Sequence, residues 1–174
     1  MLERNIYIAK KKSIFIDVDK HTVIGGVHPS PLSAHTGYFN SGIFRKVDQA
    51  LVIPLDVTDD KQLATAYEKI INTWSGIDLL LFVSGVYTPL RADDFDIHIA
   101  EQTIDANLLG PMKAVALVLP KMLQAQRGNI AIVGSVAGYS GLPKALAYGP
   151  SKAAIINFCE ILYYDLLPKG IGVH

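Results

Sequence analysis

From residue 51 onward, short apolar runs alternate with longer stretches in which apolar residues recur at helical spacing. The apolar runs predict strands at residues 51–55, 78–83, 129–134 and 171–173. The longer stretches predict helices from a cap at Thr58 or Asp59 to Gly76, over about 96–126, and over 148–167. Because the strands are apolar throughout and alternate with helices, the pattern predicts an α/β fold: a parallel sheet with helices on both faces.

The second predicted helix contains a sequence that an uninterrupted α-helix does not tolerate well. Gly110 and Pro111 lie inside it, and a proline removes a backbone hydrogen bond and crowds the preceding turn. The sequence therefore predicts a kink or local unwinding near Asn107.

The first 50 residues have a different pattern. Residues 13–17 and 22–24 predict a short β-hairpin, and a loop with two prolines follows it. This change of pattern predicts two segments, residues 1–50 and residues 51–174. The parallel sheet is thus expected to be preceded by a short β-hairpin and loop segment.

Composition narrows the class of protein. Half of the residues are apolar and 18% are charged, which indicates a globular chain with a buried core. Lys+Arg and Asp+Glu both number 16, so the net charge does not favour nucleic acid or an anionic membrane as a partner. The single cysteine, Cys159, agrees with a reducing cytoplasm. The apolar runs are too short for a signal peptide or a membrane span, so we expect a soluble cytoplasmic protein, without a metal site.

Three side chains are candidates for proton transfer. Ser135 follows the third predicted strand, Tyr148 begins the last predicted helix, and Lys152 lies four residues beyond Tyr148. Because positions i and i+4 share a helix face, the phenol and the ammonium can point into one site. An ammonium near a phenol lowers the pKa of the phenol, which suits a tyrosine to proton transfer near neutral pH. By itself, however, this spacing is more typical of an exposed helix face.

Polar or small residues also follow the first two predicted strands. Asp56 ends the run at 51–55, and Ser84-Gly85 ends the run at 78–83. In parallel sheets the carboxyl ends of the strands lie at one edge, where ligands bind. We therefore expect these residues and Ser135 to lie at the same edge.

Residues 50–174 carry five short motifs in a fixed order: Asp56-Val57-Thr58-Asp59, Ser84-Gly85, Asn107-Leu108-Leu109-Gly110, Gly134-Ser135-Val136-Ala137-Gly138 and Tyr148-x-x-x-Lys152. Together they resemble the central part of a short-chain dehydrogenase/reductase. The resemblance implies a partial Rossmann-like domain and an NAD(P)-dependent oxidoreductase. Such an enzyme would interconvert a carbonyl and an alcohol of a small molecule, and the family implies a homo-oligomer formed through the long helices.

The same resemblance implies a role for each matching residue. Tyr148 would exchange a proton with the substrate oxygen, and Ser135 would orient the carbonyl. Lys152 would lower the pKa of Tyr148 and bind the nicotinamide ribose of NAD or NADP, with Asn107 supporting a water relay to Lys152. The remaining cofactor contacts would come from Asp56 and Val57 beside the adenine, and from backbone atoms of Ser84, Gly85 and Val86.

The chain departs from the family pattern in two ways. Phe82-Val83-Ser84-Gly85 stands where the family usually has Asn-Asn-Ala-Gly, so the asparagine side-chain contacts are missing. The family's first strand, glycine-rich turn and second strand have no counterpart in the sequence. Without the turn, no helix N-terminus holds the cofactor pyrophosphate, and no residue selects NAD over NADP. The resemblance leaves two outcomes open: an active oxidoreductase, and an inactive fragment or fusion.

A second resemblance concerns residues 5–50. The string His28-Pro29-Ser30-Pro31-Leu32-Ser33-Ala34-His35, followed by Gly37-Tyr38-Phe39, resembles the C-terminal end of family 1 uracil-DNA glycosylases. In that case His28 would polarise a uracil carbonyl, and Leu32 would fill the space left by a flipped base. The family's water-activating Gly-Gln-Asp-Pro-Tyr-His segment is missing from the sequence. A DNA-repair fragment that contacts DNA through His28 and Leu32 is therefore the alternative hypothesis.

Overall fold

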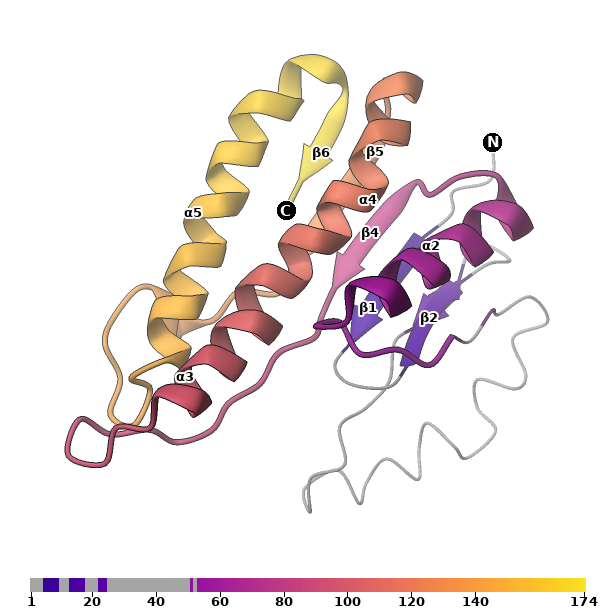
Figure 1. The fold of residues 1–174 in the computed structure, drawn as a ribbon. Coiled ribbons are helices and arrows are strands. Elements are labelled where there is room, and N and C mark those ends of the chain that lie inside the picture. Colours follow the sequence, from indigo (N-terminus) through magenta and orange to yellow (C-terminus); the bar gives the residue numbers. More distant parts are fainter. Residues whose placement is uncertain (1–4, 10–12, 18–21, 25–50, 52) are drawn as a thin grey trace.

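The computed structural model describes residues 5–9, 13–17, 22–24, 51 and 53–174, with the backbone alone for the first three ranges. The described strands form one sheet in the order β3-β2-β1-β4-β5-β6 (Figure 1). Their bounds are β1 Asn5–Ala9, β2 Ser13–Asp17, β3 Thr22–Ile24, β4 Leu79–Phe82, β5 Gly128–Ile132 and β6 Ile171–Val173. β1, β4, β5 and β6 are parallel neighbours, whereas β2 pairs antiparallel with both β1 and β3.

The first segment of the chain contributes strands to this sheet. The predicted hairpin is confirmed, because β2 and β3 pair with Asp17 opposite Thr22. The sequence analysis predicts no strand at Asn5–Ala9, yet these residues form β1 and pair in parallel with β4. Residues on both sides of the predicted boundary near residue 50 therefore belong to one sheet.

The described helices lie on one face of the sheet. Their bounds are α2 Asp60–Trp74, α3 Ile97–Ile104, α4 Gly110–Ala125 and α5 Tyr148–Leu166. The connections from β4 to β5 and from β5 to β6 step across the sheet in the same direction, and right-handed connections then place α4 and α5 on the same face. α2 lies next to α4 in front of the sheet (Figure 1). These helices supply one of the two helical layers that the sequence analysis predicts.

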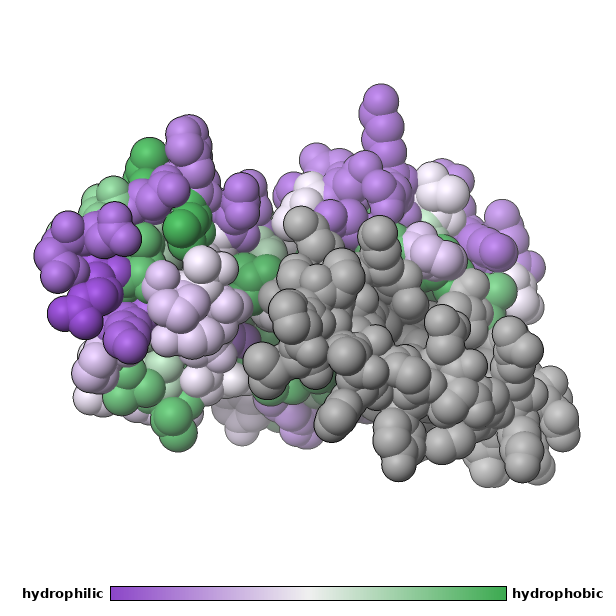
Figure 2. Space-filling model, turned by 90° about the horizontal axis from the view of Figure 1, so that it is seen from below, coloured by the Kyte–Doolittle hydropathy of each residue, from purple (hydrophilic) through white to green (hydrophobic). Residues whose placement is uncertain are grey.

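The core lies between these helices and the sheet. Along β4, Leu80 and Phe82 are 0% and 1% exposed, whereas Leu79 and Leu81 are only partly buried. The buried side chains of β4 and β5 pack with those of α2 and α4 in one cluster. Seen from below, hydrophobic residues on the described surface are interspersed with hydrophilic ones (Figure 2). The predicted α/β class, with its parallel strands and covering helices, is confirmed.

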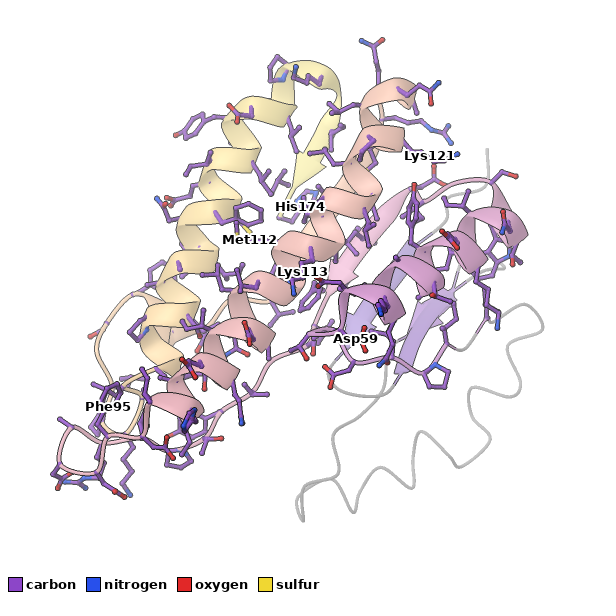
Figure 3. The ribbon with its side chains drawn as sticks, in the orientation of Figure 1. Asp59, Phe95, Met112, Lys113, Lys121 and His174 are labelled. Atoms are coloured by element: carbon purple, nitrogen blue, oxygen red, sulfur yellow. The ribbon has the colours of Figure 1, made fainter. Side chains whose placement is uncertain are left out.

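An ion pair joins two of these helices at the surface. Lys113 of α4 lies 2.6 Å from a carboxylate oxygen of Asp60, the first residue of α2. Figure 3 shows the Lys113 side chain between α4 and the start of α2.

Asp59, one of the two caps that the sequence analysis predicts, caps α2 by accepting hydrogen bonds from the backbone N–H groups of Lys61 and Gln62.

The predicted unwinding near Asn107 is confirmed as a π-helical turn. Residues Asp105–Leu109 form the turn η3 between α3 and α4, so that the helix continues from 97 to 125 with one wide turn. The N–H of Gly110 donates to the carbonyl of Asp105, five residues earlier. Pro111 explains the change, because its ring would crowd the carbonyl of Asn107 in a regular α-helix.

The prediction of a strand at 51–55 is wrong for residues 51 and 53–55, which the structure describes. Among 51 and 53–55, only Ile53 takes part in an isolated β-bridge. Pro54 follows it, and a proline has no N–H for a strand ladder. The apolar side chains serve the core nevertheless, because Ile53, Leu55 and Val57 are 8%, 3% and 1% exposed.

The continuous helix Ile97–Ala125 is long and apolar enough to cross a membrane by length and composition, which the sequence analysis does not anticipate. In its most apolar window, 44% is buried inside the protein. Ala114, Val115, Val118 and Met122 of this helix belong to the hydrophobic core. Its apolar side chains thus have a role in packing against the sheet.

Two neighbouring leucines test which face of β4 is in the core. We expect Leu80→Ala to lower the free energy of unfolding by about 3 kcal/mol, because it leaves a cavity under the helices. Leu81→Ala is the matched control, and we expect a loss of about 1 kcal/mol or less, because this side chain is partly exposed. Urea denaturation measures both values. Equal losses, or a larger loss for Leu81→Ala, would contradict the position of the core.

Candidate active site

Two polar segments leave the sheet at the same edge. β4 and β5 are parallel neighbours, with Phe82 opposite Ile132. The N–H of Val133 donates to the carbonyl of Phe82 at 2.9 Å and so extends the pairing by one residue. Ser84-Gly85 and Gly134-Ser135 therefore follow the carboxyl ends of adjacent strands, as the sequence analysis predicts.

The π-helical turn places Asn107 beside these strand ends. Asn107 is 1% exposed. Its Oδ1 accepts a hydrogen bond from the N–H of Val86 at 2.6 Å, and its Nδ2 donates to the carbonyl of Val86 at 2.9 Å. Nδ2 also donates to Oγ of Ser151 at 3.1 Å. One buried amide therefore joins the loop after β4 to helix α5.

Ser151 connects Asn107 to the first turn of α5. Its side chain is completely buried, and its Oγ donates to the backbone carbonyl of Tyr148 at 2.8 Å. Sequence reasoning missed Ser151, although its position three residues after Tyr148 on the same helix face is a signal that could have found it. The first turn of α5 is thus tied to Asn107.

Lys152 is the charged group of the site. It is 5% exposed, and its Nζ donates to the carbonyl of Val133 at 2.8 Å. Burial lowers the pKa of this ammonium below the ordinary value for lysine. Its Nζ also lies 5.8 Å from the centroid of the Tyr148 ring. The predicted pairing of Tyr148 and Lys152 on one helix face is therefore present in the structure.

Gly85 lies against the ammonium of Lys152. A Cβ added to Gly85 would lie 3.6 Å from Nζ of Lys152 and 3.4 Å from Oδ1 of Asn107. A side chain at this position would therefore begin in contact with the ammonium and with the Asn107 amide. Next to it, the buried hydroxyl of Ser84 has no hydrogen-bond partner among the described residues.

Ser135 caps a short turn that packs on α5. Its hydroxyl accepts a hydrogen bond from the N–H of Ala137 at 3.2 Å, at the start of the 3-10 turn η4, Val136–Gly138. A Cβ added to Gly138 would lie 2.8 Å from the backbone carbon and oxygen of Lys152. Because residue 138 is glycine, the turn after Ser135 can lie directly against the helix that carries Tyr148 and Lys152.

A second tyrosine lies against Tyr148. The rings of Tyr87 and Tyr148 meet edge to face, with centroids 5.2 Å apart. The hydroxyl of Tyr87 donates to the backbone carbonyl of Lys144 at 3.4 Å. Sequence reasoning missed Tyr87, because nothing in the local pattern links it to a residue 61 positions later.

Asp56 and Val57 make their contacts with residues other than those of the Tyr148 cluster. The carboxylate of Asp56 accepts hydrogen bonds from the N–H and the hydroxyl of Thr58, at 3.0 and 2.8 Å. Val57 is buried, and its Cγ2 lies 3.2 Å from the Cβ position of Gly110. Asp56 thus shapes the turn before α2, and Val57 packs beside the π-helical turn.

The described residues at this edge offer groups for acid–base chemistry. Among residues 51 and 53–174, no group of three or more His, Cys, Asp or Glu side chains could hold a metal ion. The groups that the edge does bring together are a phenol, a buried ammonium and a buried amide. Such groups can move a proton and stabilise the charge that develops.

Comparison with known proteins identifies relatives of this chain. The profile of a family described as short chain dehydrogenase matches residues 40–174. The chain is 32% identical over 127 residues to 2-dehydro-3-deoxy-L-rhamnonate dehydrogenase (NAD(+)) of Sphingomonas sp. strain SKA58. It is 30% identical over 136 residues to trans-4-hydroxycyclohexanecarboxylate dehydrogenase of Sinomonas cyclohexanicum. These alignments cover 72% and 78% of this chain and 51% of each relative, so the chain spans about half the length of the curated relatives that it matches.

Solved structures share the fold. A short-chain dehydrogenase from Streptomyces avermitilis gives a TM-score of 0.71 at 20% identity, over 80% of this chain and 51% of that chain. ElxO with NADP bound gives a TM-score of 0.70 at 23% identity, over 83% of this chain and 58% of that chain. The predicted Rossmann-like fold is confirmed by these similarities.

The buried ammonium leads to a prediction about pH. Because burial lowers the pKa of Lys152 in the folded chain, the unfolded chain binds more protons at this residue just below the ordinary pKa of lysine. The stability of the wild-type chain relative to Lys152→Met should therefore rise as the pH increases toward the ordinary lysine pKa of about 10.4. Urea denaturation at several pH values measures this difference. Lys169→Met, at an exposed position, is the matched control. A difference that falls over this range would contradict the prediction.

Proposed function

Because the chain belongs to the short-chain dehydrogenase family, we propose that it takes part in the NAD(P)-dependent interconversion of a carbonyl and an alcohol. The observation that carries this proposal is the cluster of Tyr148, Lys152 and Asn107 at the carboxyl edge of the sheet. The family match covers residues 40–174, which include all the residues of this cluster.

Tyr148 is the proposed proton donor and acceptor. In the direction of reduction, its hydroxyl gives a proton to the substrate oxygen as the carbonyl becomes an alcohol. The ammonium of Lys152, 5.8 Å from the ring centroid, stabilises the phenolate that remains. Ser135 follows the adjacent strand end, and its hydroxyl is proposed to orient the substrate carbonyl. The network from Asn107 through Ser151 holds the first turn of α5, and thereby Tyr148, in position.

The described residues fit the nicotinamide-ribose end of the cofactor. An ammonium has three N–H donors, and the carbonyl of Val133 uses one of those of Lys152. Gly85 leaves open the space beside this ammonium. Lys152 would therefore hold the ribose hydroxyls, and Gly85 would admit the ribose. When bound, NAD(P) supplies or accepts the hydride, while the protein supplies position and proton transfer.

Other predicted cofactor contacts remain proposals. Asp56 and Val57 are proposed to lie beside the adenine, and Ser84 to contact the cofactor through backbone atoms. Both backbone polar groups of Val86 already bond with Asn107, which favours Gly85 as the closest contact of this loop. Within the described residues, none matches the family's glycine-rich turn, so the fit concerns the ribose end alone. The proposal includes both NAD and NADP, since one relative is named for NAD(+) and one similar structure has NADP bound.

The substrate is proposed to be a small molecule that carries a carboxylate in addition to its carbonyl or alcohol. The two named relatives support this class, because the name of each contains an acid, a rhamnonate in one case and a cyclohexanecarboxylate in the other. We also place the protein in the cytoplasm, in agreement with its single, partly buried cysteine.

Self-association through the long helices is a further part of the proposal. α4 exposes Met112 and Leu123, and α5 exposes Ile161 and Tyr164, at 37%, 37%, 54% and 76%. Figure 3 shows Met112 on the side of α4 that faces α5. Apolar side chains exposed on neighbouring helices favour a contact with a second copy of the chain.

The comparisons give no support to the alternative of a uracil-DNA glycosylase fragment. His28 and Leu32, on which that hypothesis depends, lie outside the described residues. The family match begins at residue 40 and so overlaps the predicted first segment. We therefore do not propose a function in DNA repair.

The role of Tyr148 is tested by Tyr148→Phe. We expect this change to lower the rate of carbonyl reduction by at least about 100-fold, because it removes the proton donor. NADH or NADPH binding, followed by cofactor fluorescence, should remain. Tyr164→Phe is the matched control, because Tyr164 lies on the same helix and is 76% exposed.

Two outcomes would contradict the proposed function. If Tyr148→Phe retains turnover, Tyr148 is not the proton donor. If neither NADH nor NADPH binds to the wild-type chain, the chain does not act as an oxidoreductase by itself, which is the inactive alternative that the sequence leaves open.

A further inference from the structure

A cavity of about 750 Å³ lies beside the candidate active site. Its walls come from the loop after β4, from the segment between β5 and α5, and from the first turns of α5. The lining includes Leu90, Arg91, Leu142, Lys144, Leu146 and Pro150. A volume of this size falls in the range of pockets that hold small molecules.

The two loops that line this open cavity are hydrogen-bonded to each other. The N–H of Leu90 donates to the carbonyl of Lys144 at 2.9 Å, and the N–H of Leu146 donates to the carbonyl of Leu90 at 3.3 Å. Leu90 and Ala145 form an isolated parallel bridge, and both are buried. The wall of the cavity is therefore held in shape before any ligand binds.

Lys144 has an unusual backbone in this wall. Its φ is 62°, in the left-handed region that a residue with a side chain rarely adopts. Its carbonyl accepts hydrogen bonds from both the N–H of Leu90 and the hydroxyl of Tyr87. Since Tyr87 also contacts the ring of Tyr148, Lys144 is connected to the proposed proton donor through one side chain. Strain of this kind is often found at functional positions.

The charges around the cavity do not cancel. Nε of Arg91 forms an ion pair with Asp93 at 3.0 Å, and both residues line the cavity. Lys144 also lines it, and among the described residues no carboxylate lies within ion-pair distance of its ammonium. The first turn of α5 carries no acidic residue. One positive charge thus remains beside a largely aliphatic wall.

We propose that this cavity binds the apolar body of a substrate with one carboxylate, and that Lys144 is the residue that pairs with the carboxylate. This inference rests on the proposed function, and it assigns the specificity for an acid to one side chain. Lys144 determines specificity through ground-state binding and takes no part in the proton transfer. An uncharged ester could accept only a hydrogen bond from the ammonium of Lys144, whereas a carboxylate would form a stronger hydrogen bond between opposite charges.

The test compares two unreactive probes, cyclohexanecarboxylate and its methyl ester, by calorimetric titration of the full chain with and without NAD⁺. We expect the carboxylate to bind about threefold to fivefold more tightly than the ester, as for a partly exposed ion pair. Lys144→Met should remove this preference, whereas Lys144→Arg should keep it because it keeps the charge. Lys169→Met, an exposed lysine outside the cavity lining, is the matched control and should keep the preference.

Equal binding of the two probes by the wild-type chain, no binding of either, or a preference unchanged in Lys144→Met would overturn the inference. If Lys144→Met does not fold, the salt dependence of probe binding by the wild-type chain tests the inference in place of this variant. The preference for the carboxylate should then decline as salt rises to about 1 M, and a preference that is independent of salt would overturn the inference. Because the probes do not react, this result is separate from turnover. Absence of carbonyl reduction would contradict the proposed function but not the role of Lys144 in binding a carboxylate. Absence of a carboxylate preference would contradict the role of Lys144 but not the proposed function.

Discussion

The hydrogen bonds of the Asn107 amide are the interaction on which the candidate site depends. A buried amide needs partners for its donors and its acceptor, and Asn107 finds them in both backbone groups of Val86 and in Oγ of Ser151. Leaving one such group unpaired costs about 1–3 kcal/mol. The loop after β4, the wide helical turn and the start of α5 therefore hold one another in place. This arrangement fixes the start of α5, and with it the positions of Tyr148 and Lys152.

The π-helical turn is the local structure that places Asn107 at this point. Pro111 cannot donate to the carbonyl of Asn107, and Gly110 lies so close to Val57 that a Cβ would be 3.2 Å from Cγ2. The helix therefore widens over Asp105–Leu109. Wide turns of this kind occur frequently at functional sites, because they change the direction of a side chain without ending the helix.

Helix α5 contributes to two adjacent regions. Lys152 and Ser151 are buried toward the strand ends and Asn107, whereas Gly149, Pro150 and Ala153 line the cavity beside Lys144. One helix thus contributes residues both to the proposed place of the cofactor ribose and to the proposed place of the substrate body. Tyr148, at the first position of this helix, has its ring centroid 5.8 Å from Nζ of Lys152 and directly precedes Gly149, which lines the cavity.

The sequence by itself determined most of the local elements and the identity of the side chains that are proposed to react. Apolar periodicity is a property of neighbouring residues, so it located α2, α4, α5, β4 and β5, and Pro111 indicated the widened turn. Only the tertiary structure decided the contacts between distant residues: Asn107 with Val86 and Ser151, 21 and 44 positions away. It also added β1 beside β4 and replaced the predicted strand at 51–55 by a single β-bridge. These features depend on which segments meet in space, and local spacing carries no information about such partners.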